Sequence, residues 1–152
     1  MNLRKATILD ATQIQHLIAS FAGKRVMLPR SLNFVYENIR DFWVAEDQGM
    51  VVGCAALHVV GWQDLAEIKS LSVSSDYQKS GLGKKLVDKC IQEAKPLGVK
   101  RIFALTFVPD FFKRCDFSVI DREDLPHKIW TDCIDCPFFD NCKEIAVQLD
   151  LE

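Results

Sequence analysis

The chain is predicted to belong to the α/β class, with a mixed, mostly antiparallel central sheet flanked by helices on both faces. Segments of strand type adjoin one another in its first half, and a hairpin turn joins two of them. Three segments carry apolar residues at helical spacing. The longest of these precedes a continuous apolar run at 101–107, which is typical of a strand buried on both faces. Hairpins combined with crossovers argue against a purely parallel sheet.

The bulk properties are those of one ordinary globular domain. The chain has 152 residues, of which 49% are hydrophobic and 26% are charged, so we expect one domain over residues 1–152. The net charge of -2 argues against a nucleic-acid or membrane partner. No apolar run reaches the ~20 residues that span a bilayer, and the first residues do not form a signal peptide. We therefore expect a cytoplasmic protein.

The first half is expected to contain a strand, two helices and three further strands. A weakly alternating strand covers 3–8, and Asp10 is expected to cap a helix that ends at Gly23. Ser31 is expected to cap a second helix. Strands are predicted at 42–46, 51–60 and 65–73, with a hairpin turn at Asp47-Gln48-Gly49 between the first two.

The second half is expected to alternate helices with strands. A loop at 74–83 opens a long amphipathic helix that continues to about Lys95, after which Pro96 and Gly98 end it. The remaining predicted elements are a strand at 101–107, a short helix at 110–115, a strand at 117–120, a long loop at 121–142 and a last strand at 144–149.

The loop Gln78-Lys79-Ser80-Gly81-Leu82-Gly83 has the features of an anion-binding site. Its glycines allow a ligand to approach the backbone closely, and the helix that follows presents N–H groups without helical partners. Lys79, Lys84 and Lys85 add positive charge. The spacing matches neither a Walker loop nor a Rossmann fingerprint. Alone, the two glycines also fit an ordinary turn between a strand and a helix.

In this context the chain resembles the GNAT superfamily of N-acetyltransferases, whose signature [RQ]-x-x-G-x-[GA] is met by Gln78, Gly81 and Gly83. The segment 111–117 is similar to the superfamily's aromatic helix, with Asp116 replacing the usual glycine. The resemblance implies a GNAT acyltransferase fold, acetyl-CoA as acetyl donor and pairing as a homodimer in many members. It implies that the coenzyme contacts Leu71, Ser72, Val73, Gln78, Lys79, Ser80, Gly81, Leu82, Gly83, Lys84 and Phe112.

Acetyl transfer to an amine needs a base, because such an amine is protonated near neutral pH. Glu67 is the candidate base, since it lies in an otherwise apolar strand. The alternative is a carboxylate that faces water from the strand. Ser70 is a second catalytic candidate, and Thr106 is expected to contact the acceptor, although both also fit as ordinary strand hydroxyls. Many superfamily members use a tyrosine as general acid where this chain has Phe112, so the acid is a different group or none is needed.

Segments around Arg30, Glu67, Thr106 and the tail at 125–130 also resemble the short, stand-alone form of N-acetylglutamate synthase. The resemblance implies a small amino-acid substrate, L-glutamate, acetylated on its α-amine in the first step of arginine synthesis. Arg30 and Lys128 are the candidate carboxylate ligands, because a guanidinium or ammonium group pairs with a carboxylate. Both also fit as solvated surface cations. The alternatives are another amino acid or small amine as acceptor, and a non-catalytic acyl-CoA sensor.

Three cysteines in the predicted long loop have partial metal-site spacing. Cys133 and Cys136 form a C-x2-C pair and Cys142 follows, so these thiolates could hold zinc if a fourth ligand is supplied from elsewhere. Structural thiols or a redox pair are the alternatives. Cys54 and Cys90 fall in apolar patterns and are expected to be core residues.

Metal analysis distinguishes these interpretations of the cysteine segment. Protein purified without chelator should carry about one zinc ion per chain if the loop is a metal site. A content well below one ion per chain would contradict the metal site and leave the thiol interpretations.

Overall fold

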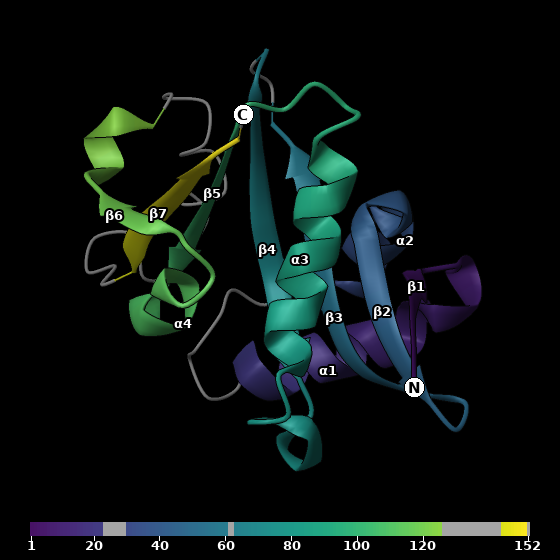
Figure 1. Ribbon diagram of the computed structural model, residues 1–152. Coiled ribbons are helices and arrows are strands. Elements are labelled where there is room, and N and C mark those ends of the chain that lie inside the picture. Colours follow the sequence, from purple (N-terminus) through teal and green to yellow (C-terminus); the bar gives the residue numbers. More distant parts are fainter. Residues whose placement is uncertain (23–29, 61–62, 126–143, 152) are drawn as a thin grey trace.

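A seven-stranded sheet forms the centre of the described part of the computed structural model, which comprises residues 1–22, 30–60, 63–125 and 144–151. The strands run in the order β1-β2-β3-β4-β5-β7-β6 (Figure 1). All neighbours are antiparallel except β4 and β5. The strands are β1 Asn2–Lys5, β2 Phe42–Asp47, β3 Met50–Val59, β4 Leu65–Val73, β5 Arg101–Thr106, β6 Ser118–Ile120 and β7 Ile145–Asp150. The predicted mixed, mostly antiparallel sheet is confirmed.

Helices cover both faces of the sheet, as predicted from the sequence. They are α1 Ala11–Ala22, α2 Leu32–Glu37, α3 Leu82–Ala94 and α4 Pro109–Lys113. The apolar stripe of α3 packs on one face, together with Phe112 of α4. α1 and α2 lie on the other face (Figure 1). Their residues Ile14, Ile18 and Val35 are buried against the sheet. None of the helices that the structure describes is long and apolar enough to cross a membrane.

The N-terminal boundary differs from the prediction. β1 ends at Lys5, and a single 3-10 turn at Ile8–Asp10 precedes α1. Asp10 reaches back to the backbone N–H of Thr7 at 2.8 Å, so the helical segment begins with a capping box at Thr7. Arg4 donates to both oxygens of Asp10, and these bonds hold the pKa of that carboxyl below its ordinary value.

Gly53 brings α3 close to the centre of the sheet. A Cβ atom at this position would lie 3.1 Å from Cδ1 of Leu86 and 3.2 Å from Cδ2 of Leu82. The missing side chain therefore leaves the room that these two leucines fill. Because Leu82 and Leu86 belong to the first turns of α3, this contact fixes where the helix begins relative to β3 and β4.

The two central strands pair only over a short distance. Register pairs join β4 to β5 at Leu65, Ala66 and Glu67, opposite Arg101, Ile102 and Phe103, whereas β4 continues to Val73. A bulge follows in β4, where Ser70 and Leu71 lie opposite the single residue Ala55 of β3. Ser70 has a φ of 58°, in the left-handed region. The bulge thus bends β4 after its pairing with β5 has ended.

Cys54 and Cys90 are core residues, as expected from their apolar surroundings in the sequence. Both have no exposed surface, and Cys115 is 5% exposed. All three are free thiols. Burial raises the pKa of Cys54 and of Cys90 to about 12 and raises that of Cys115 as well.

Leu86→Ala is expected to lower the free energy of unfolding by about 2–5 kcal/mol, because Leu86 is fully buried between α3 and β3. Leu97→Ala is the matched control. Leu97 is 59% exposed after α3, so its truncation should change stability by less than about 0.5 kcal/mol. Urea denaturation measures both variants. A loss at Leu86 no larger than the loss at Leu97 would contradict this packing.

Candidate active site

Glu67 and Lys69 lie on the same face of β4, on the side of the sheet covered by α1 and α2. Glu67 is in register with His58 of β3 and with Phe103 of β5, so it lies in the middle of three adjacent strands. Lys69 is in register with Ala56, which is part of the core beneath α1 and α2. The Lys69 Nζ atom is 3.9 Å from Oε1 of Glu67, and only 10% and 12% of these side chains are exposed. The predicted base therefore has a cation beside it.

The aromatic ring of Phe34 lies close to both Lys69 and a second cation, Arg30. Ser31 caps α2, and its Oγ atom accepts a hydrogen bond from the Phe34 N–H at 3.0 Å. The Arg30 guanidinium carbon is 4.5 Å from the centroid of the Phe34 ring, and Nζ of Lys69 is 5.7 Å from the same centroid. Arg30, Phe34, Lys69 and Glu67 thus form one cluster, here called the acceptor cluster.

Lys69 was not among the site residues predicted from the sequence. Its alternation with Glu67 along an extended strand could have placed both side chains on one face. The contact between Phe34 and Lys69 could not be predicted from the sequence pattern, because it joins segments that are far apart in the chain. Lys128, the second cation predicted from the sequence, lies outside the described residues, as do Cys133, Cys136 and Cys142.

Asp41 and His58 lie beside the acceptor cluster. Asp41 ends the 3-10 turn Ile39–Asp41, and its Oδ2 atom is 2.8 Å from Nδ1 of His58. The side chains of His58 and Asp41 are 37% and 28% exposed. His58 is the register partner of Glu67 on the neighbouring strand, so its side chain is on the same face.

The predicted phosphate loop leads directly into α3. Gly81 has a φ of 84°, and a Cβ atom there would meet nothing within 4 Å. The first helical hydrogen bond runs from the Lys85 N–H to the Gly81 carbonyl at 3.1 Å. The N–H groups of Leu82, Gly83 and Lys84 precede that bond and have no partner within the helix. The helix begins on an open surface with its positive dipole end and adjacent lysines, which suits a phosphate group.

Three side chains hold the loop in shape. The hydroxyl of Tyr77 donates to Oδ2 of Asp47 at 2.5 Å, and this hydrogen bond raises the pKa of Tyr77. The Gln78 side-chain amide donates to the Val73 carbonyl at 3.0 Å, and the Ser80 hydroxyl donates to the Tyr77 carbonyl. Gln78, the first residue of the signature, therefore ties the loop to the end of β4.

The aromatic helix α4 reaches the phosphate loop through Phe111. A Cβ atom at Gly83 would lie 3.1 Å from Cε1 of Phe111, so glycine leaves room for this ring. Phe112, which was predicted to contact the coenzyme, is 4% exposed and packs edge-on against Phe111 and Phe117 in the core. The structure therefore brings Phe111, rather than Phe112, to the loop.

The remaining predicted residues lie on different faces of the sheet. Leu71 and Val73 of β4 pack toward the α3 face, whereas Ser72 is buried on the opposite face and donates to the Ser70 carbonyl at 3.3 Å. Thr106 is also buried, and its Oγ1 atom accepts from the Val108 N–H at 2.9 Å. Strand alternation places Thr106 on the opposite face of β5 from Phe103, away from the acceptor cluster. Among the described residues, no group of three or more His, Cys, Asp or Glu could hold a metal ion.

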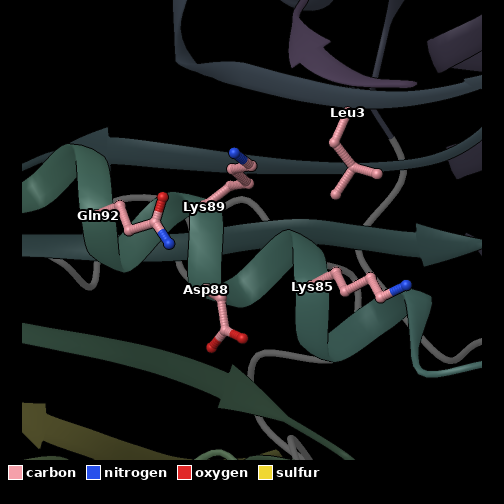
Figure 2. A pocket seen from close by; sticks show the side chains of 5 residues that line it. All are labelled: Leu3, Lys85, Asp88, Lys89 and Gln92. Carbon is pink, nitrogen blue, oxygen red and sulfur yellow. The ribbon is translucent and has the colours of Figure 1, made fainter. Parts of the chain in front are cut away.

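A separate groove of about 360 Å³ lies between β1 and α3. Figure 2 shows its lining: Leu3 of β1 and Lys85, Asp88, Lys89 and Gln92 of α3. None of these residues belongs to the acceptor cluster. The groove therefore does not contribute to the arrangement around Glu67.

Known proteins are similar to this chain in sequence and in fold. The model of the acetyltransferase (GNAT) family matches residues 11–117. An uncharacterized N-acetyltransferase of Chlorobaculum tepidum is 40% identical over 145 residues, covering 95% of this chain and 93% of the relative. An amino-acid acetyltransferase of Mycobacterium tuberculosis is 40% identical over 122 residues, covering 78% of this chain and 69% of the relative.

Two solved structures extend the comparison. The Mycobacterium tuberculosis protein Rv2747, in complex with CoA and NLQ, superposes with a TM-score of 0.85 at 32% identity and full coverage of both chains. N-acetylglutamate synthase from Neisseria gonorrhoeae, complexed with coenzyme A and N-acetyl-glutamate, gives a TM-score of 0.91 at 27% identity. This match covers 99% of the chain but only 35% of the Neisseria chain.

The chain therefore belongs to the GNAT family of acetyltransferases. It is an acyltransferase, and N-acetyl transfer is the class of reaction that its relatives share.

Tyr77→Phe is expected to raise KM for the acetyl donor about threefold to tenfold, because the phosphate loop loses its hydrogen bond to Asp47. KM for the acetyl acceptor should stay the same. Tyr36→Phe is the matched control, since Tyr36 is exposed on α2, away from this loop. Equal donor KM values for the two variants would show that the hydrogen bond does not prepare the loop.

Proposed function

We propose that the protein transfers the acetyl group of acetyl-CoA to the α-amine of L-glutamate. The observation that carries this proposal is the acceptor cluster, in which Arg30 and Lys69 both lie over the ring of Phe34 beside Glu67. Two cations over one aromatic ring, one of them beside a candidate base, suit an acceptor that has two carboxylates and one amine.

The charges of the cluster favour an acidic acceptor over a basic one. The planar guanidinium of Arg30 can hold one carboxylate through two parallel hydrogen bonds, and the Lys69 ammonium offers a point charge to another. A polyamine would be repelled by both groups. Because the side chain of Lys69 is only 10% exposed, water screens its attraction for a carboxylate less than at an open surface.

Glu67 is proposed as the base. The acceptor arrives as an ammonium ion near neutral pH, so one proton must leave the nitrogen before it can attack the thioester carbonyl. Glu67 lies on β4, the central one of three adjacent strands, and its Oε1 atom is 3.9 Å from Nζ of Lys69. Pairing of β4 with both neighbouring strands fixes the position of the Glu67 backbone. An acceptor whose carboxylates bind Arg30 and Lys69 would bring its amine close to the Glu67 carboxylate.

The open end of β4 and the phosphate loop fit the acetyl donor. Acetyl-CoA supplies the acetyl group as a thioester, and its pyrophosphate suits the N–H groups that open α3. The part of β4 beyond Glu67 has no register partner on β5, which leaves backbone groups near Leu71 and Val73 to bind an extended arm. A backbone N–H at the Ser70 bulge would stabilise charge that develops on the thioester oxygen.

The comparisons support this proposal without fixing the acceptor. Relatives named amino-acid acetyltransferase are 40% identical or less, and the Neisseria synthase structure contains N-acetyl-glutamate. Another amino acid is the second candidate acceptor, since the acceptor cluster would also bind one carboxylate next to the amine. Thiol release from acetyl-CoA, measured over a panel of amino acids and polyamines, distinguishes these cases, and glutamate should give the highest kcat/KM.

Arg30→Ala and Lys69→Met are each expected to raise KM for glutamate about 10- to 100-fold, because each removes a charged hydrogen-bond partner of a carboxylate. KM for acetyl-CoA should change little. Arg114→Ala and Lys95→Met are the matched controls, since both residues are exposed and far from Phe34 in the sequence. Equal effects on the KM values of both substrates would argue against a carboxylate role.

A further inference from the structure

The pair formed by Asp41 and His58 has no role in the reaction described so far, although it lies next to the proposed base. A carboxylate oxygen can only accept, so the 2.8 Å contact requires that Nδ1 of His58 carries the proton. In the neutral ring, Nε2 is then the proton acceptor. Asp41 therefore fixes the tautomer that leaves His58 able to take up a proton.

The register of the sheet brings this imidazole close to Glu67. His58 and Glu67 are direct partners on antiparallel strands, and side chains at such positions have Cβ atoms about 4.5–5.5 Å apart. Both project from the face that α1 and α2 cover. The distance between their Cβ atoms is therefore short enough for the two side chains to meet directly or through one water molecule.

The two side chains differ in their access to water. Glu67 is 12% exposed, whereas His58 is 37% exposed. A base that takes a proton from the acceptor in each cycle must lose that proton before the next one. With its carboxylate almost enclosed, Glu67 needs a route to solvent, and His58 is its more exposed neighbour on β3.

We propose that the Asp41–His58 pair relays the acceptor's proton from Glu67 to solvent. The acceptor ammonium gives one proton to Glu67, and the amine nitrogen then bonds to the acetyl carbon while the carbon–sulfur bond breaks. The second amine proton goes to the departing thiolate. Glu67 passes its proton to Nε2 of His58, the imidazolium forms beside Asp41, and His58 releases the proton to water. Each cycle thus frees one proton and returns all three side chains to their starting states.

This inference rests on the proposed function only in taking Glu67 as the base for an amine acceptor, not in the choice of glutamate. The charged groups that face His58 are Asp41 from the 3-10 turn and Glu67 from β4, with Lys69 further along β4. His58 stays hydrogen-bonded to Asp41 while it carries the proton, and its side chain is more exposed than that of Glu67. The arrangement therefore leads the proton from Glu67 outward.

His58→Gln tests the relay, because glutamine can still hydrogen-bond Asp41 but cannot carry a proton. At low buffer concentration and saturating substrates, kcat should fall about 10- to 100-fold, while KM for the acceptor stays the same. Added imidazole should restore kcat in proportion to its concentration. His16→Gln is the matched control, since His16 is exposed on α1, and it should behave as the wild type, which imidazole does not accelerate.

Asp41→Asn gives a second, independent variant, because an amide no longer fixes the tautomer of His58. Its kcat should also fall, with rescue by imidazole. Either variant overturns the relay if kcat is unchanged, if imidazole gives no rescue, or if KM for the acceptor rises while kcat is retained, which would make His58 a carboxylate ligand. A fall in kcat that follows a lowered melting temperature, without rescue, would show that the pair is only a structural link.

The choice of acceptor is tested separately. If another amine is acetylated and glutamate is not, the proposed acceptor is wrong, and the imidazole experiment is performed with that amine. If glutamate is acetylated and His58→Gln behaves as the wild type, the relay alone is wrong.

Discussion

The short parallel pairing of β4 with β5 is the constraint on which the rest of the structure depends. Three register pairs join the strands, and β4 then continues through a bulge at Ser70 without its neighbour. A parted pair of strands exposes backbone N–H and C=O groups in the middle of a sheet, where they must find other partners. α3 packs against one face of the sheet, and β3 pairs with the other edge of β4. These contacts hold β4 in place where it has no pairing with β5.

Both halves of the candidate site are extensions of that one strand. Before the bulge, β4 presents Glu67 and Lys69 to the face covered by α1 and α2. After it, Leu71 and Val73 turn to the α3 face, and the chain enters the loop that Gln78 ties back to Val73. The donor and the acceptor of an acyl group can therefore approach β4 from different faces of the sheet. They would meet where the pairing of β4 with β5 has ended.

Local patterns in the sequence were enough to predict most of the elements and the glycine-containing loop that opens α3. Helical spacing predicted α3, and the glycines at its start predicted the loop, because both depend on residues that are neighbours in the chain. The same patterns could not separate Phe111 from Phe112, since both are apolar in a helix of a single turn or so. Lys69 was not predicted as a site residue, because its contact with Phe34 joins segments that only the folded protein brings together.

The buried thiols have a consequence for a protein that handles activated acyl groups. A thioester can pass its acyl group to any nearby thiolate, and free coenzyme can form mixed disulfides with oxidised cysteines. Cys54, Cys90 and Cys115 are enclosed by apolar neighbours, and burial raises the pKa of each, so at neutral pH they stay protonated. In the described part of the chain, the core thus protects the protein from acylating itself.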